Sequence, residues 1–262
     1  MHSSDRIAYP PVVKRILSVW FRHFRVYTRN IYSNGLPPFL EPLIFLVGIG
    51  VGMGRYVGEL NGISYLAFLA TGLPLTAAMY TSAFECSYGT FIRLEFERIY
   101  DGMLAASISV EDIVIGEILW AGSKGFFFSF AVILIISLFG LVPLSAVIIT
   151  PFIGFLTGLL FASLSLLITT FVKNINHFNF YFTGFLSPMF FFSGVVFPLE
   201  NLPLAVQYFA ELLPLTHSVR MVRQVAFSQI TPVFLWDLLF MLVCVFIGVF
   251  VASARLKRRL ID

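Results

Sequence analysis

The sequence predicts an all-α membrane protein with six transmembrane helices, an N-terminal amphipathic interfacial helix and short re-entrant helices after span five. Of its 262 residues, 58% are hydrophobic and 12% are charged, whereas soluble domains are roughly 45–50% apolar and about 25% charged. Six apolar stretches also reach the roughly 20 helical residues that a hydrocarbon core about 30 Å thick requires. Because a helix satisfies its own backbone hydrogen bonds in lipid, these stretches favour helices over strands.

Composition divides the chain into two parts. Residues 1–36 form a cytoplasmic N-terminus with the interfacial amphipathic helix, and residues 37–262 form the six-span transmembrane domain. The predicted spans cover residues 37–56, 63–84, 113–141, 144–171, 178–196 and 233–254. A charged loop of residues 85–112 joins spans two and three, and a loop of residues 197–232 joins spans five and six.

The distribution of Lys and Arg predicts the orientation in the membrane, because these residues are retained on the cytoplasmic side. With the N-terminus inside, most of the 17 Lys and Arg residues fall in cytoplasmic segments, and only Arg55, Arg220 and Arg223 lie on the far side. We therefore expect a multi-pass protein of the inner (plasma) membrane with both termini in the cytoplasm.

The segment before span one, VVKRILSVWFRHFRVYTRNIY, repeats apolar residues in steps of three and four. One face carries Val13, Ile16, Leu17, Trp20, Phe24, Tyr27 and Ile31, and the opposite face carries Arg15, Ser18, Arg22, Arg25 and Arg29. This pattern predicts a basic helix that lies flat at the membrane surface. A simple positive-inside anchor remains the alternative.

The loop of residues 85–112 predicts a short helix over residues 91–104, followed by a turn. Arg93 and Glu97 stand four residues apart and Glu95 and Arg98 three apart, the spacing of neighbours on a helix surface. Tyr100, with Phe91 and Leu94, is left to contact apolar groups, and Ser109 with Asp112 predicts a cap for span three. A helix of this kind suits the docking of a soluble partner, and a solvated loop is the alternative.

Four ionisable residues fall inside the predicted spans, where charges are costly and usually face protein or water. They are Glu41, Glu117, Lys124 and Asp237. Glu41 and Asp237 lie near span ends, where we expect hydration. Glu117 and Lys124 are separated by a rise of about 10.5 Å, so Lys124 is expected to meet another helix or a wet cavity, in the transport path or in subunit packing, with snorkelling as the alternative.

Span five is interrupted within FLSPMFFFSGVVFP, residues 185–198. Pro188 removes a backbone donor and predicts a kink, with Ser187 or Ser193 able to satisfy a freed carbonyl. Gly194 then allows a turn and Pro198 ends the run. We interpret this segment as a hinge or gate rather than a packing kink; with Lys124, the predicted path or gate residues are Pro188, Phe190, Phe191, Phe192, Ser193, Gly194 and Pro198.

The loop of residues 197–232 contains NLPLAVQYFAELLP, whose apolar residues step by four, three and four. It predicts a helix that lies in the outer interface or folds partly back into the membrane. His217, Arg220 and Arg223 follow and form a predicted outer-face cluster. This cluster suits contact with a polar or anionic substrate at its exit, while interfacial anchoring is the alternative use of an arginine.

Motifs for catalysis are absent from the sequence. No lysine sits in a GxxxxGK[ST] phosphate loop, no Ser/His/Asp or Cys/His pattern indicates a nucleophile, and the four histidines lack metal-ligand spacing. We therefore expect no enzymatic activity, no metal site and no cofactor in this chain. Glycines four residues apart predict close helix packing at three places, namely Gly48 and Gly52, Gly50 and Gly54, and Gly154 and Gly158.

Several stretches together resemble the permeases of the ABC-2 type, and in particular the nodulation-factor export permeases and their polysaccharide- and drug-exporting relatives. They are GEILWAGSK at residues 116–124 and FLSPMFFFSGVVFPLENLP followed by PLTHSVRMVR. The resemblance implies a homodimer that pairs with a separate ABC ATPase, which holds ATP and Mg. It also implies that the helix of residues 91–104 is a coupling helix, with Arg93, Glu95, Glu97, Arg98 and Tyr100 as its contacts. Many relatives carry a Thr-Pro step where this chain reads AASISVED, so the local geometry of the loop is expected to differ.

These observations favour an ATP-driven exporter of an amphipathic substrate such as a lipid-linked oligosaccharide or a lipo-oligosaccharide. Aromatic side chains suit such cargo because they contact both acyl chains and sugar rings. Export of hydrophobic drug-like molecules is the alternative within transport, and an ion-coupled secondary transporter is the alternative from another class. Membrane lipids are expected as further partners, and nucleic acid is not.

Overall fold

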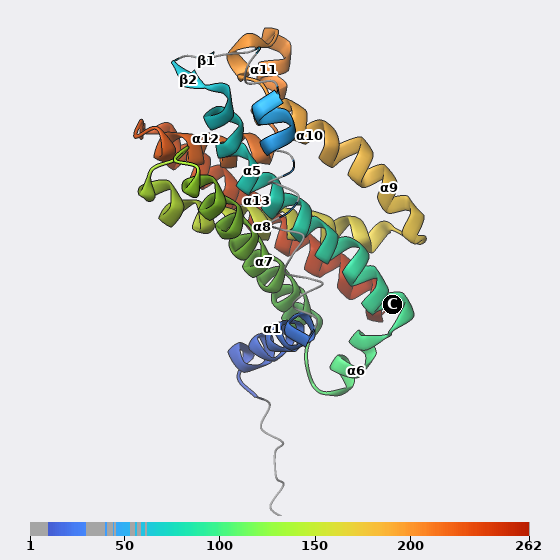
Figure 1. Ribbon diagram of the computed structural model, residues 1–262. Helices are drawn as coiled ribbons and strands as arrows, with labels where there is room; N and C mark the ends of the chain where they lie inside the picture. The colour runs from blue at the N-terminus through green and yellow to red at the C-terminus, as the bar shows by residue number, and fades with distance from the viewer. Residues whose placement is uncertain are drawn as a thin grey trace, which may run out of the picture.

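The computed structural model describes residues 10–29, 40, 44, 46–52, 56, 59–60 and 62–261. Half of predicted span one, including Glu41 and Arg55, lies outside the described residues. The described part is a bundle of helices with one small hairpin, in which β1 (Glu59–Leu60) pairs antiparallel with β2 (Ile63–Ser64) (Figure 1). Apart from this hairpin, the predicted all-α class is confirmed.

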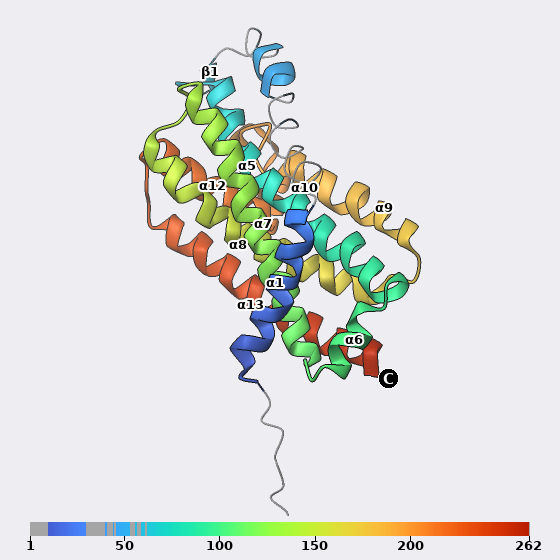
Figure 2. The same cartoon turned by 60° about the horizontal axis from the view of Figure 1, so that its bottom comes forward.

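Four helices in the described part are long and apolar enough to cross a membrane. They are α5 (Tyr65–Phe84), which continues helically to Phe96, α7 (Val110–Leu138), α8 (Leu144–Phe171) and α13 (Val233–Ile261). They correspond to predicted spans two, three, four and six. The bundle surrounds most of the apolar length of α5, whereas α13 runs along its edge and leaves most of its apolar length exposed (Figure 2).

Helices α7 and α8 approach closely along a line of small residues. A Cβ built at Gly125 of α7 would lie 2.7 Å from the backbone oxygen of Gly154, and one built at Gly158 of α8 would lie 3.0 Å from the Cα of Gly122. The predicted close packing at Gly154 and Gly158 is therefore confirmed. At Gly48 and Gly52, by contrast, a built Cβ meets no atom within 4 Å.

We expect Gly125→Val to lower the thermal unfolding temperature markedly, because the added side chain would collide with backbone that cannot rotate away. Overpacking of this kind typically costs about 1–3 kcal/mol. Gly102→Ala is the matched control, since a Cβ at this helical position meets nothing within 4 Å. Thermal unfolding of both variants in lipid nanodiscs measures the difference, and equal unfolding temperatures would contradict the close approach.

The segment of predicted span five consists of α9 (Phe178–Tyr181), a π-helical turn (Phe182–Leu186) and α10 (Ser187–Phe192). Helical residues thus continue on both sides of Pro188, with the wider π-helical turn just before it. The Ser187 hydroxyl donates to the backbone oxygen of Phe182 at 3.0 Å, which also accepts the Ser187 N–H. The predicted bond from a serine to the carbonyl freed by Pro188 is therefore not the one that forms. Gly194 makes the turn that ends the segment, with a φ of 78°.

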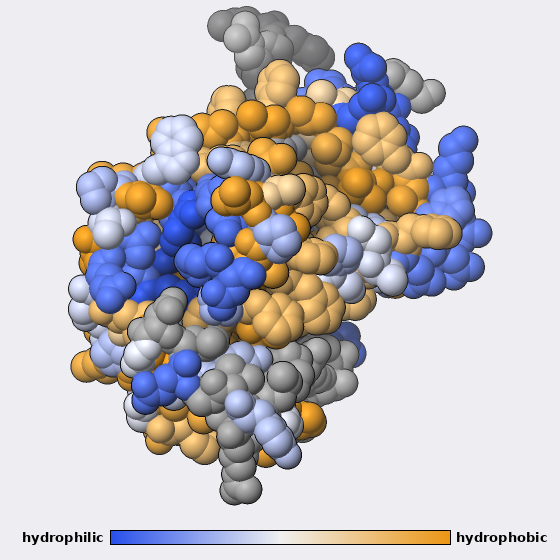
Figure 3. Space-filling view, turned by 90° about the horizontal axis from the view of Figure 1, so that it is seen from above, coloured by the Kyte–Doolittle hydropathy of each residue, from blue (hydrophilic) through white to orange (hydrophobic). Residues whose placement is uncertain are grey.

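The remaining helices lie at the two ends of the bundle (Figures 1 and 2). One end, which we call the α6 end, holds α1 (Val12–Arg29), α6 (Ile99–Ala105) and the C-terminus. The other, the α11 end, holds the hairpin and α11 (Leu204–Ala210). Helix α12 (Pro214–Ala226) packs against α5, α8 and α13. Seen from the α11 end, hydrophilic side chains gather around a depression in a largely hydrophobic surface (Figure 3).

Candidate functional site

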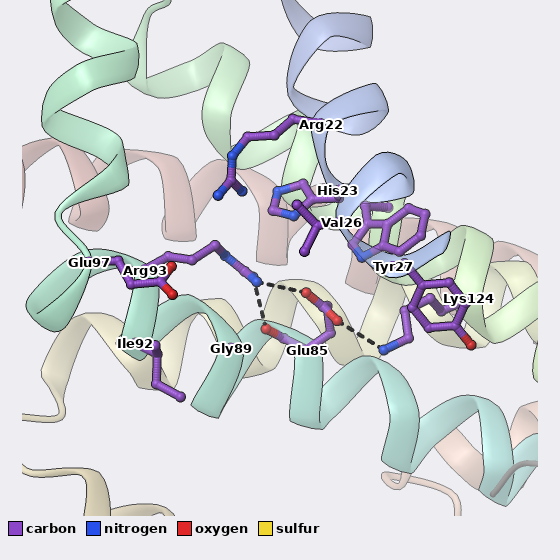
Figure 4. Close-up of a pocket in the computed structure, with 11 residues that line it drawn as sticks. Arg22, His23, Val26, Tyr27, Glu85, Gly89, Ile92, Arg93, Glu97 and Lys124 are labelled. Atoms are coloured by element: carbon purple, nitrogen blue, oxygen red, sulfur yellow. Dashed lines mark hydrogen bonds and ion pairs between the residues drawn. The ribbon is translucent and has the colours of Figure 1, made fainter. Parts of the chain in front are cut away.

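A network of charged side chains joins four separate elements of the bundle. Figure 4 shows its members His23, Glu85, Arg93 and Lys124. Its members come from α1, from the helical continuation of α5, from α6 and from α7. We call it the ionic network, and it consists of His23, Glu85, Arg93, Tyr100, Glu117 and Lys124.

Glu117 of α7 is the centre of the ionic network and is fully buried. One carboxylate oxygen, Oε2, accepts from Arg93 Nη2 at 2.6 Å. The other, Oε1, accepts from the Tyr100 hydroxyl at 2.6 Å and lies 3.0 Å from His23 Nε2. Because a buried carboxylate is costly unless it is paired and hydrogen-bonded, Glu117 holds α1, α5 and α6 together against α7.

Glu85 is the second acidic member, and it bridges two cations. Its Oε1 accepts from Arg93 Nη1 at 2.8 Å and its Oε2 from Lys124 Nζ at 2.9 Å. Lys124 therefore meets a different helix, as its distance from Glu117 along α7 predicts. The two glutamates share Arg93, so the side chains form one connected group rather than separate pairs.

Tyr100 reaches Glu117 because the chain changes direction just before α6. Arg98 adopts a left-handed conformation with a φ of 49°, which ends the helix that runs to Phe96 and redirects the chain. The predicted single helix over residues 91–104 is thus wrong, since two helical pieces flank Glu97 and Arg98. Burial and the Glu117 carboxylate raise the pKa of Tyr100 well above its usual value, so its hydroxyl stays protonated and donates.

The charge pairs expected along the surface of this segment are not the ones that form. Arg93 turns inward to Glu85 and Glu117, and Glu95 pairs with Arg259 of α13 at 2.6 Å. A surface pair three or four residues apart contributes only about 0.2–0.5 kcal/mol. Removing Arg93 from two buried carboxylates would cost far more, so the tertiary contacts decide its position.

The ionic network also brings together a set of possible metal ligands. Ligand atoms of His23, Glu85 and Glu117 lie within 4.8 Å of one another. All four carboxylate oxygens, however, already accept from Arg93, Lys124 or Tyr100. Two cationic side chains thus balance the two carboxylates, and the group fits a structural ion-pair network rather than a metal site. A cavity of about 300 Å³ borders it.

Helix α1 is docked on α7 by polar contacts as well as by packing. Arg15 Nε donates to Asp112 Oδ2 at 2.6 Å, and the same carboxylate closes the predicted cap of α7 with Ser109. Trp20 Nε1 donates to Ser123 Oγ at 3.0 Å. The predicted helix is confirmed, but Arg15, assigned to the polar surface, is instead bound to Asp112. Several residues of the predicted apolar face remain exposed, namely Val13, Leu17 and Phe24.

At the α11 end, the structure separates the predicted outer-face cluster into two parts. His217 Nδ1 lies 2.7 Å from Asp237 Oδ1, and Arg220 binds both Asp237 and Glu211. Asp237 is fully buried, so the expectation of a hydrated carboxylate at a span end is wrong. Burial removes water from the Asp237 carboxylate, and hydrogen bonds with His217 and Arg220 replace those that water would form. Arg223 points away from this group.

The predicted path or gate residues are also divided between the two ends. Lys124 belongs to the ionic network, whereas Ser193 and Pro198 border a cavity at the α11 end. Phe191 and Phe192 expose 49% and 41% of their surface and are free to meet lipid, cargo or another chain. Phe190 packs against the core cluster instead. Their contact with cargo stays a prediction.

Sequence patterns missed Glu85, His23 and Asp237 as members of buried charge clusters. Asp237 carried a signal as an ionisable residue inside a predicted span, and Glu85 carried one because it follows an apolar span at the start of the charged loop. His23 lies on a basic amphipathic helix, and nothing along the chain connects it to Glu117. These groups meet through packing between elements that are distant in sequence.

Four long apolar helices, two of which, α5 and α7, are joined through the ionic network, define a multi-pass membrane protein. Comparison of the sequence with known proteins makes the assignment specific, because the ABC-2 type transporter family matches residues 14–227. The chain therefore belongs to the ABC-2 type transporter family, which confirms the resemblance found in the sequence.

Named relatives cover most of the chain. Nodulation protein J of Rhizobium leguminosarum bv. viciae is 35% identical over 246 residues, 93% of this chain and 94% of that protein. Nodulation protein J of Sinorhizobium fredii (strain NBRC 101917 / NGR234) is 37% identical over 207 residues, 79% of each chain. The inner membrane transport permease YadH of Escherichia coli (strain K12) is 25% identical over 202 residues, 77% of this chain and 78% of that protein.

Proposed function

We propose that this chain is the permease subunit of an ATP-driven exporter in the inner membrane, with both termini in the cytoplasm. In this proposal two copies form the transmembrane part, each with six spans, and a separate ABC ATPase supplies ATP and Mg. Membership of the ABC-2 type transporter family supports it. The observation that carries it is the ionic network, which fastens the loop between α5 and α7 to the buried part of the bundle.

The residues predicted for coupling fall into an outward and an inward set. Glu95, Glu97 and Arg98 are exposed at the α6 end, where a soluble subunit has access to them. Arg93 and Tyr100 point inward and bind Glu117. A displacement of α6 would therefore act directly on α7, because the Tyr100 hydroxyl is hydrogen-bonded to the Glu117 carboxylate at 2.6 Å.

Helices α11 and α12 would form the re-entrant part of the permease. Both are too short to span a membrane, and they follow the segment of predicted span five. Packing of α12 against α5, α8 and α13 supports a position partly inside the transmembrane bundle. In this arrangement the turn at Gly194 joins the fifth span to an outer gate.

We infer an amphipathic substrate with a saccharide part, such as a lipo-oligosaccharide or a lipid-linked oligosaccharide. The names of two relatives that cover most of the chain, both called Nodulation protein J, and the exposed aromatic side chains Phe191 and Phe192 support this class. Export of hydrophobic drug-like molecules is the second candidate, because exposed phenylalanines would suit them equally.

Co-purification with an ABC ATPase encoded beside this chain tests the proposal. We expect a stable complex whose ATP hydrolysis rises several-fold with a glycolipid substrate, and less with hydrophobic dyes of similar size. A chain that binds no such ATPase and transports under an ion gradient alone would instead be a secondary transporter. Stimulation by the dyes alone would favour the drug-export candidate.

A further inference from the structure

A second cavity, of about 530 Å³, opens at the α11 end, which places it on the side away from the ionic network. It corresponds to a ligand-sized site, because small-molecule pockets typically measure about 300–1,000 Å³. Its walls come from the start of α5, from the segment after α10, and from α11 and α12. The view from this end shows hydrophilic side chains around the depression (Figure 3).

Arg223 is the principal charge in the wall of this cavity. Its guanidinium lies 3.6 Å from the centre of the Phe68 ring and donates to Thr71 Oγ1 and to two backbone oxygens at 3.3–3.4 Å. Within the described part of the chain, no carboxylate forms an ion pair with it, in contrast to Arg220. Burial lowers the pKa of Arg223 to about 9, so it remains a cation at neutral pH.

Two further donors in the same wall lack protein partners. The Ser193 side chain belongs to a residue that is 1% exposed, and its buried hydroxyl forms no hydrogen bond within the described residues. Gln224 uses its amide oxygen to accept from the N–H and hydroxyl of Thr231, while its amide nitrogen is bonded to no described group. A buried polar group without a partner costs about 1–3 kcal/mol, so the Ser193 hydroxyl indicates a ligand with an acceptor oxygen. The amide nitrogen of Gln224 can donate to a second acceptor of the same ligand.

The charges in the wall narrow the chemical class of that ligand. Arg220 forms an ion pair with Glu211, and the Glu200 carboxylate attracts the Arg223 guanidinium at longer range. A multiply charged anion such as phosphate would be repelled by the glutamates. A sugar ring instead carries hydroxyls that both donate and accept, and its C–H faces suit aromatic side chains at the rim, here Tyr208 and Phe227.

We propose that this cavity is a saccharide-binding site. Arg223, Ser193 and Gln224 donate hydrogen bonds to hydroxyl oxygens of an uncharged sugar ring, and the Glu200 carboxylate accepts one in return. Its role in export, as the place where the sugar part of the cargo arrives, rests on the proposed function. Sugar binding itself depends only on the cavity.

The test uses the full-length permease in lipid nanodiscs without any ATPase. Glucose, N-acetylglucosamine and maltose are the probes, and saturation-transfer NMR measures their binding. We expect at least one of them to bind, with affinity lowered 10-fold or more in Arg223→Gln and in Ser193→Val. The second change replaces the buried hydroxyl by methyl groups, which cannot donate a hydrogen bond. Ser187→Ala is the control, since that hydroxyl bonds within its own helix outside the cavity.

Thermal unfolding of each variant separates lost binding from lost folding. Should Arg223→Gln fail to fold, Ser193→Val still decides, because this change is small. Absence of sugar binding in the wild type, unchanged binding in both variants, or stronger binding of inorganic phosphate would overturn the saccharide site. None of these results would affect complex formation with the ATPase, and a failed complex would leave sugar binding measurable, so the two proposals fail separately.

Discussion

Replacing Arg93 by Met should lower the stability of the permease by about 3–5 kcal/mol, the cost of removing one partner from a buried ion pair. Arg93 donates to both Glu85 and Glu117, so its loss leaves Lys124 as the remaining strong cation for one buried and one largely buried carboxylate. Thermal and denaturant unfolding in nanodiscs measures the loss. Transport should fall with it, because the helical segment that leads into α6 would lose its bond from Arg93 to Glu117 of α7.

Two further variants distinguish charge burial from general damage at Arg93. Combining Arg93→Met with Glu117→Gln should recover part of the lost stability, since the double variant removes the carboxylate left without its cation. Lys257→Met is the surface control, because its pair with Glu111 is about half exposed and exposed pairs contribute at most about 1 kcal/mol. An Arg93 variant as stable as the Lys257 variant would show that the ionic network does not hold these elements together.

The second large effect concerns function rather than stability. Glu97→Gln combined with Arg98→Asn should abolish substrate export while the associated ATPase still hydrolyses ATP, because both residues are exposed where a soluble subunit would dock. Asn is chosen at position 98 since it tolerates the left-handed conformation found there. Export and ATP hydrolysis in the same proteoliposomes give the ratio of the two rates.

The control for this pair is Glu111→Gln, an exposed carboxylate at the start of α7 that does not belong to the segment around α6. It should leave both rates unchanged. Unaltered export in the Glu97 and Arg98 double variant, with the protein folded, would remove these residues from the docking surface. Loss of ATP hydrolysis together with export would instead indicate that the complex does not assemble.

Much of the helical framework could be predicted because the membrane imposes a simple requirement of length and hydrophobicity on each span. Residues 144–171 were predicted and found with the same limits, and Pro143 and Val172 at their edges are both extended. The π-helical turns that carry α5 on to Phe96 were not predicted. These turns place the charged residues Glu85, Arg93 and Glu95 in a continuation of the α5 helix, in a region that the sequence assigns to the loop between spans two and three.

Charge partners were the least predictable feature. Local spacing assigned Arg93 to Glu97 and left Asp237 to water, yet both residues are bound within the protein. The reason is the free-energy cost of burying an unpaired charge, which favours any packing that brings an opposite charge or a hydrogen-bond donor next to it. Such partners come from helices that are distant in sequence, so the spacing of residues within one segment does not predict them.

The sequence by itself determined that this protein is a helical membrane protein, where its four long apolar helices lie and that it resembles the ABC-2 type permeases, because hydrophobic length and turn residues act locally. Only the tertiary structure decided how Glu117 gathers Arg93, Tyr100 and His23, and which arginine at the α11 end has no carboxylate partner among the described residues. These arrangements depend on which helix faces meet. Close packing at small residues and the desolvation of charge set that choice.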